Sequence, residues 1–230
     1  MDDVARFSEV GDRYGEQLAR GLRLTGESAE YFARRRIARV QQLAASCDVR
    51  VNAVLDFGCG TGASFPLLRA AFPGARVLGF EPAAGLRALA AQAAAASGAD
   101  VIDADALTAA DAADLVYCNG VFHHIPPSAR ASAMASAARA LRRGGLACIW
   151  ENSPYNPGAR LVMWRIPFDR DAVVLAPREL RGLHAAAGLT PVTTEFHFIF
   201  PSVLRFARPI EGPLRALPLG GQYVVVGRKD

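Results

Sequence analysis

The chain has 230 residues, of which 51% are hydrophobic and 21% are charged, and its formal net charge is +4. This length fits one large domain, or one domain with a lid, and the apolar content is sufficient for a core. The basic residues are scattered along the chain, so the charge does not indicate a nucleic-acid-binding surface. A polar N-terminus and the lack of any apolar run near 20 residues predict a cytoplasmic protein that does not engage a membrane.

The four cysteines are far apart in the sequence, and no two have the spacing of a zinc or redox motif. We therefore expect no metal site, and we expect free thiols, as in a reducing compartment. The four are Cys47, Cys59, Cys118 and Cys148.

The N-terminal part of the chain, residues 1–46, has apolar residues at helical spacing. Two glycines in residues 21–27 predict a loop that interrupts this pattern. A segment ahead of the first strand can cover the site which that strand builds. We expect a helical lid, with Tyr14 beside the bound cofactor; simple helical packing is the alternative.

From residue 51 onward, apolar strand patterns alternate with helical patterns. This order is typical of a doubly wound α/β fold, in which a mostly parallel sheet carries helices on both faces and binds ligands at the carboxyl ends of the strands. The predicted strands are 51–56, 76–81, 100–103, 114–119, 146–151, 189–200 and 222–228, and the predicted helices are 63–71, 83–96, 128–142 and 178–187.

The first strand runs into the glycine turn Gly58-Cys59-Gly60-Thr61-Gly62. Together with Ala63 the turn matches the dinucleotide fingerprint, and Glu81 at the end of the second strand stands where a ribose-binding acid belongs. These two features do not distinguish NAD from other nucleoside cofactors.

Asp56, two residues before the turn, argues against NAD. A carboxylate at this place would repel a pyrophosphate, whereas it suits the ammonium and sulfonium groups of S-adenosylmethionine (SAM). Asp103 and Ala104 follow the third strand, where a carboxylate can accept from an adenine amino group. Asn119 and Gly120 follow the fourth strand, where backbone carbonyls can meet the ammonium group.

These motifs together resemble the class I SAM-dependent methyltransferases. Residues 54–62 (VLDFGCGTG) resemble the first motif of that family, and residues 77–82, 103–107, 113–119 and 141–145 resemble the later ones. The resemblance implies a Rossmann-like seven-stranded sheet whose last strand is antiparallel, with SAM as cofactor and S-adenosylhomocysteine as product. The cofactor-binding residues that it implies are Asp56, Gly58, Cys59, Gly60, Gly62, Glu81, Pro82, Asp103, Ala104, Asn119 and Gly120.

The remaining segments are where members of this family differ, and they usually shape the acceptor pocket. We divide the chain into the lid, residues 1–46, and a methyltransferase domain, residues 47–230. Within that domain, residues 152–177 and 201–221 are the expected acceptor-site insertions. Aromatic and basic residues of the first insertion are candidate pocket residues, with core packing as the alternative for the aromatic ones: Tyr155, Trp164, Arg165 and Phe168.

Methyl transfer requires a base only when the acceptor must lose a proton. His123 and His124 follow the fourth strand, and either imidazole could act as that base; His124 is favoured, and a purely structural role is the alternative. Glu151, after the fifth strand, is a candidate for fixing a polar acceptor, as is its neighbour Asn152; capping of the turn before Pro154 is the alternative.

The sequence thus predicts an enzyme that methylates O, N or C of a small molecule, as a monomer or homodimer without nucleic acid. Specialised metabolism is the candidate setting. The alternative is a SAM-binding protein without methyl transfer. An NAD(P)-dependent oxidoreductase is disfavoured by Asp56. Methylation of a nucleic-acid base or an amide is disfavoured because the Asn152-Ser153-Pro154-Tyr155 loop follows the fifth strand instead of the fourth.

Overall fold

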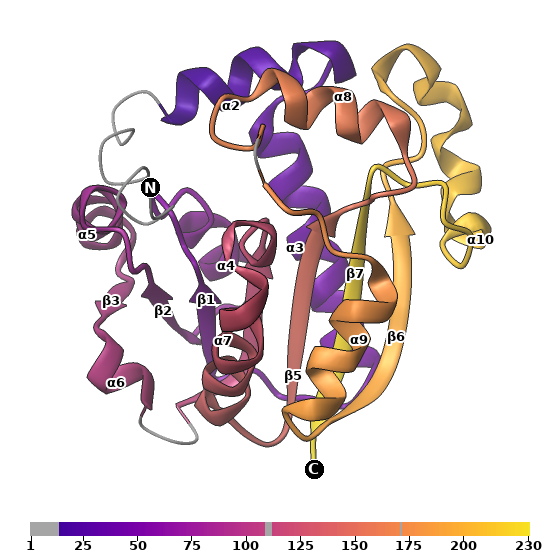
Figure 1. Ribbon diagram of the computed structural model, residues 1–230. Coiled ribbons are helices and arrows are strands. Elements are labelled where there is room, and N and C mark those ends of the chain that lie inside the picture. Colours follow the sequence, from indigo (N-terminus) through magenta and orange to yellow (C-terminus); the bar gives the residue numbers. More distant parts are fainter. Residues whose placement is uncertain (1–13, 109–111, 171) are drawn as a thin grey trace.

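The protein is built on one seven-stranded sheet (Figure 1). The computed structural model describes residues 14–108, 112–170 and 172–230. The strand order is β3-β2-β1-β4-β5-β7-β6, and β7 is antiparallel to both of its neighbours, which confirms the predicted fold class. The strands are β1 (Ala53–Phe57), β2 (Arg76–Phe80), β3 (Asp100–Ile102), β4 (Ala113–Asn119), β5 (Leu141–Asn152), β6 (Leu189–His197) and β7 (Gln222–Lys229).

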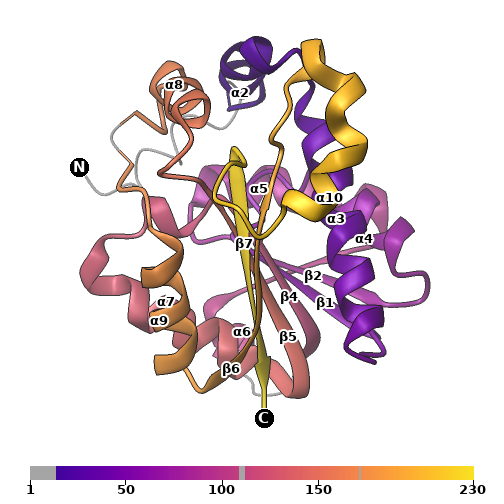
Figure 2. The same cartoon turned by 90° about the vertical axis from the view of Figure 1, so that its right-hand side faces the viewer.

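Helices cover both faces of the sheet, as Figure 2 shows in side view. Neighbouring residues of β1 belong to two separate apolar clusters: Val54 packs with α3, α4 and α5, whereas Leu55 packs with α6, α7 and α9. Both faces are therefore buried, which explains why the inner strands are apolar throughout. The helices on these faces are α3 (Ala29–Ser46), α4 (Phe65–Ala71), α5 (Ala84–Ser97), α6 (Ala104–Thr108), α7 (Pro127–Ala140) and α9 (Pro177–Ala186).

Local signals in the sequence explain where several helices begin. Ser28 caps α3 by accepting a hydrogen bond from the Tyr31 N–H, at 3.1 Å. Asn156 does the same for α8 (Pro157–Arg165), at 2.9 Å from the Ala159 N–H. Proline occupies the first position of α7, α8 and α9, where its missing N–H has no cost.

A second layer of helices lies beyond the carboxyl ends of the strands (Figure 1). Here α2 (Tyr14–Leu22) runs beside α8, and the ring of Tyr14 stacks on that of Phe168 with centroids 4.6 Å apart. A Cβ added at Gly21 would lie 2.2 Å from Ile166, so glycine at this position lets the two helices approach closely. The remaining elements of this layer are the 3₁₀ helix η2 (Arg23–Thr25), the 3₁₀ helix η4 (Ser202–Ile210) and α10 (Glu211–Leu214).

Two of the boundaries that differ from the sequence prediction have a local explanation. The expected loop over residues 21–27 is short, since helix continues through Leu22 and Thr25 and the chain turns only at Gly26, with φ of +70°. The predicted strand 189–200 ends at His197, because Phe198 adopts a φ of +63° and leaves the sheet. Residues 1–13 of the predicted lid lie outside the described part of the chain. Among the helices that the structure describes, none combines the length and apolar character needed to span a membrane.

Candidate active site

The glycine turn connects β1 to α4 and is tied to the neighbouring strand. The N–H groups of Gly58 and Cys59 both donate to the Phe80 carbonyl, at 2.8 and 3.0 Å. Gly58 and Gly60 have φ values of +77° and +57°, which only glycine adopts readily. A Cβ at Gly58 would collide with Val121, whereas a Cβ at Gly60 would meet no described atom within 4 Å. At Gly60 the backbone is therefore open to a ligand.

A cavity of about 440 Å³, here called the glycine-turn cavity, lies beside this turn. Its acidic wall residue is Glu81, which is 7% exposed and accepts hydrogen bonds from the N–H groups of Gly60 and Ala83, both at 2.9 Å. Burial raises the pKa of Glu81. Seven of the predicted cofactor residues line this cavity: Tyr14, Gly58, Gly60, Glu81, Pro82, Asn119 and Gly120.

The other predicted cofactor residues do not line it. Asp56 is buried beneath the turn, where it accepts a hydrogen bond from the Ser64 hydroxyl, and burial raises its pKa to about 7. Cys59 is also buried, and Gly62, with φ of +76°, packs against Phe65. Asp103 accepts from the Ala106 N–H, at 2.8 Å, at the start of α6, whose first residue is Ala104. Their contact with a cofactor stays a prediction.

A second cavity, of about 470 Å³, lies beneath α2 and α8 and is called the helical cavity. It is lined by residues from three segments that are far apart in the sequence, 14–36, 119–169 and 198–222. Much of its wall is apolar, and Arg36, Asn152 and Gln222 add polar groups. Of the four predicted pocket residues only Phe168 lines it. Trp164 and Tyr155 are 60% and 55% exposed, and Arg165 lies on the outer side of α8.

The two cavities share four wall residues: Tyr14, Asn119, Gly120 and His124. Ligands bound in both cavities would therefore meet at the end of β4. At this junction the Oδ1 atom of Asn119 is buried and makes no hydrogen bond within the described part of the chain. An acceptor atom in this state suits a donor group of a ligand, such as the ammonium of SAM.

His123 and His124 form the 3₁₀ helix η3 (Phe122–His124) next to this junction. Nδ1 of His123 lies 2.5 Å from Oε2 of Glu151. Glu151 is fully buried, and its Oε1 accepts from the N–H groups of Val121 and Phe122, at 3.2 and 2.7 Å. Glu151 therefore lies behind His123 and lines neither cavity, which favours a positioning role over contact with the acceptor.

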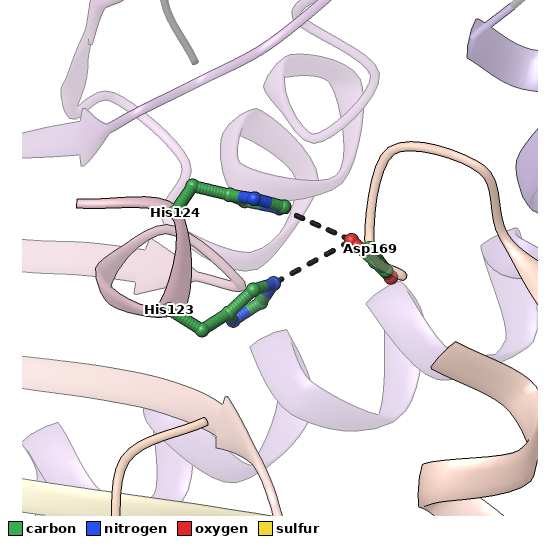
Figure 3. Close-up of side chains that lie close together, drawn as sticks. All are labelled: His123, His124 and Asp169. Carbon is green, nitrogen blue, oxygen red and sulfur yellow. Dashed lines mark ion pairs between the residues drawn. The ribbon is translucent and has the colours of Figure 1, made fainter. Parts of the chain in front are cut away.

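Asp169 is the residue that the sequence did not single out. Its Oδ1 lies 3.1 Å from Nε2 of His124 and 3.6 Å from Nε2 of His123 (Figure 3). All three side chains line the helical cavity. Asp169 follows the histidines by 45 residues in a proline-containing segment, and no local pattern marks it as their partner.

Burial and charge act in opposite directions on this cluster. Burial lowers the pKa of His123, but the carboxylates of Glu151 and Asp169 raise it to about 10. Burial also lowers the pKa of His124, and the neighbouring His123 adds to this effect. Burial raises the pKa of Asp169, but the two histidines outweigh it and bring the value to about 2.

The buried side chain of Arg130 connects the segment that carries the two histidines to the segment that carries Asp169. Arg130, on α7, donates to the carbonyls of Phe122 and Ile125 at 3.1 and 3.0 Å, and to that of Val173 at 2.6 Å. The Val173 N–H in turn donates to the His123 carbonyl at 3.0 Å. The positions of the histidines and of Asp169 are thus set by one shared network.

The sheet order defines a Rossmann-like α/β protein, and the glycine turn and the acid after β2 border a cavity at the carboxyl ends of the strands, where this fold class binds its ligands. Residues 54–145 match the family described as a methyltransferase domain. Over these residues the match supports the resemblance to the class I SAM-dependent methyltransferases that the sequence motifs indicated. A search of curated proteins found no match.

Solved structures share the fold at low sequence identity. A proposed O-methyltransferase from Nostoc punctiforme is 17% identical with a TM-score of 0.57; the match covers 84% of this chain and 55% of that one. Geranyl diphosphate C-methyltransferase from Streptomyces coelicolor, solved with Mg²⁺ and S-adenosylhomocysteine, is 17% identical with a TM-score of 0.56, covering 78% and 71%. The cyclase SpnF is 18% identical with a TM-score of 0.55, covering 82% and 80%.

Proposed function

We propose that the protein transfers the methyl group of SAM to an O, N or C atom of a small molecule bound in the helical cavity. The observation that carries this proposal is that two cavities of about 440 and 470 Å³ meet at shared wall residues. Both volumes lie in the usual range for small-ligand sites. An acceptor in one cavity and the sulfonium in the other are then held for in-line displacement, which depends mainly on orientation.

The residues of the glycine-turn cavity fit SAM. Glu81 lines this cavity and would accept hydrogen bonds from the ribose hydroxyls, and the open backbone at Gly60 would allow the methionine part to lie against the turn. The unsatisfied Oδ1 of Asn119 is placed to accept from the ammonium group. When bound, SAM supplies a methyl group on a positively charged sulfur, which leaves as a neutral thioether.

His124 is the histidine that borders both cavities, so it lies nearest to the point of transfer. In the simplest mechanism its imidazole takes the proton that a hydroxyl or amine loses on methylation. His123 lies one residue back, and Glu151 holds it in place through Nδ1. In this proposal His124 contacts the acceptor, His123 lies next to His124, and Glu151 positions His123.

The proposed setting is the cytoplasm, with the protein acting in specialised metabolism as a monomer or homodimer, without nucleic acid or membrane. The four cysteines are free thiols, which supports a reducing compartment. The helical cavity narrows the acceptor to a molecule that fits about 470 Å³ and carries substantial apolar surface.

A second candidate function is a SAM-binding protein that catalyses another reaction. One observation favours it: a protein named as a cyclase shares the fold, so the fold alone does not require methyl transfer.

The test is a screen of small molecules with purified protein and SAM, read out as S-adenosylhomocysteine release and a gain of one methyl group in the product. Coupled formation of both products supports the proposal. Tight SAM binding with no methylated product across hydroxyl, amine, thiol and carbon acceptors would favour the second candidate.

A further inference from the structure

We propose that His123, His124 and Asp169 bind a divalent transition-metal ion such as Zn²⁺ in the wall of the helical cavity (Figure 3). One donor atom of each side chain lies within 4.8 Å of the others. Two imidazoles and one carboxylate form a donor set that divalent transition ions prefer, and this set leaves further coordination positions open.

The spacing of the donor atoms fits such an ion. Metal–ligand bonds of about 2.1 Å place neighbouring donors about 3.0–3.4 Å apart in octahedral or tetrahedral geometry. Oδ1 of Asp169 lies 3.1 Å from Nε2 of His124 and 3.6 Å from Nε2 of His123. Small side-chain movements would bring all three donors onto one ion.

The burial of His123 and the missing hydrogen bond of its Nε2 atom, among the described residues, support the metal site independently. Its side chain is 2% exposed, and its Nε2 atom makes no hydrogen bond to any residue that the structure describes. A separation of 3.6 Å from Asp169 is too long for such a bond. A buried polar atom without a hydrogen bond is costly, and a metal ion would use its lone pair.

The other ring nitrogen of His123 pairs with a carboxylate, as is usual for histidines that bind a metal. Nδ1 of His123 lies 2.5 Å from the fully buried carboxylate of Glu151. Such a carboxylate fixes the proton on Nδ1 and turns Nε2 toward the metal. Because Glu151 also accepts from two backbone N–H groups, its own position is fixed.

Charge balance favours the ion as well. Glu151 and Asp169 are two buried carboxylates, 0% and 8% exposed, that face the two imidazoles. Buried charges require compensation. A divalent ion that displaces the proton from Nε2 of His123 would compensate the charges of both carboxylates.

The role of the ion rests on the proposed function. Because all three ligands line the helical cavity, its open positions face the acceptor. With the ion bound, His124 is a ligand and not the base that the metal-free mechanism assigns to it. A hydroxyl or thiol bound at the ion would instead lose its proton to solvent more readily, since a bound cation lowers the pKa of the group. The acceptor atom then bonds to the methyl carbon while the carbon–sulfur bond breaks and its electron pair stays on sulfur.

Metal binding by untagged, chelator-treated full-length protein tests the site. Equilibrium dialysis against Zn²⁺, read out by elemental analysis, is expected to give one ion per chain. Asp169→Asn and His124→Gln are expected to lower the affinity by at least about 100-fold, beyond the 10–100-fold typical of losing an outer carboxylate. Glu151→Gln is expected to fall within that 10–100-fold range.

His197→Gln is the matched control, because His197 also pairs with a carboxylate, that of Glu195 at 3.1 Å, but lines neither cavity. Its zinc affinity is expected to equal that of the wild type. Co²⁺ gives a second readout, as visible absorption bands that the Asp169→Asn and His124→Gln variants lose. Equal zinc binding by wild type and Asp169→Asn, or none by the wild type, would overturn the site.

SAM titration by calorimetry separates this inference from the proposed function. SAM affinity of the zinc-free protein and of Asp169→Asn is expected to lie within about 2-fold of the wild type, which also shows that the variant folds. Methyl transfer without zinc binding would overturn the metal site and leave the function standing. Zinc binding without methyl transfer to any acceptor would support the site and overturn the function.

Discussion

The two cavities are similar in volume but are built in different ways. The glycine-turn cavity takes its walls mainly from the ends of β1, β2 and β4, and most of its residues belong to short contiguous motifs. The helical cavity combines an N-terminal helix, the segment after β5 and the segment after β6. The first cavity is therefore determined locally, whereas the second depends on contacts between distant parts of the chain.

The largest expected effect concerns the network that holds the helical cavity together. Arg130→Ala leaves three backbone carbonyls without their buried donor and breaks an ion pair with Glu179 at 2.7 Å. We expect the free energy of unfolding to fall by about 3–5 kcal/mol, because three backbone carbonyls lose a buried charged donor, at about 1–3 kcal/mol for each buried group left unsatisfied. Urea denaturation measures this, with the exposed Arg139→Ala on the same helix as control. A loss below about 1 kcal/mol would show that the network is dispensable.

The next effect concerns the glycine-turn cavity. Glu81→Ala removes the carboxylate that is placed for the ribose, and each charge-assisted hydrogen bond contributes about 1.5–3 kcal/mol. Two such bonds correspond to a loss of SAM affinity of at least about 100-fold, measured by calorimetry. Glu30→Ala, at an exposed position on α3, is the control and should bind SAM normally. Comparable affinities of the two variants would exclude the ribose role.

A substitution that partly fills the helical cavity should lower kcat/KM for the acceptor and leave SAM affinity unchanged. Val162→Trp adds a large ring to the cavity wall, and we expect kcat/KM for the acceptor to fall by about 10-fold or more, since a misplaced acceptor loses orientation. SAM affinity should stay within about 2-fold. Trp164→Ala, on the solvent side of the same helix, is the control. Equal losses for both ligands would mean that the cavities are not independent.

The smallest effect is a pH dependence of stability at the outer edge of the sheet. Arg39 of α3 pairs with Glu195 of β6 at 2.7 Å. Burial raises the pKa of Glu195, but His197 and Arg39 outweigh this effect and lower it to about 2. Because the pKa is lower in the folded state than the usual value of about 4.3, the stabilisation is present above about pH 4.3 and is lost as the pH falls toward 2.

Denaturation of wild type and Glu195→Gln at pH 7 and pH 3 measures this contribution. The difference between the two proteins is expected to be roughly 1 kcal/mol or less at pH 7, as for partly exposed pairs, and smaller at pH 3. SAM affinity should be the same in both proteins. A difference that grows as the pH falls would contradict the assignment.

The sequence predicted the sheet well because alternating patterns and local turn chemistry specify it. The strand positions and the antiparallel last strand agree with the structure. Boundaries that depend on tertiary packing were less accurate. The 21–27 region is mostly helical because α2 packs on α8 through Gly21, and a pattern within one segment does not contain that contact.

The site divides in the same way. The motif residues Gly58, Gly60 and Glu81 line one cavity, as the resemblance implied. Asp56, which decided the choice between cofactors, lies beneath the turn and bonds Ser64. Trp164 faces solvent, because the orientation of α8 about its own axis is set by its contact with α2, and Tyr155 is exposed in the turn before this helix.

By itself, the sequence determined the α/β architecture and the cofactor motifs, since both depend on periodicity and on residues that are neighbours in the chain. Only the tertiary structure brought Asp169 to the two histidines and placed Glu151 behind them. It also joined α2, α8 and the segment after β6 into one cavity. The physical reason is that these contacts link residues far apart in the sequence, and their geometry is fixed by packing across the carboxyl edge of the sheet.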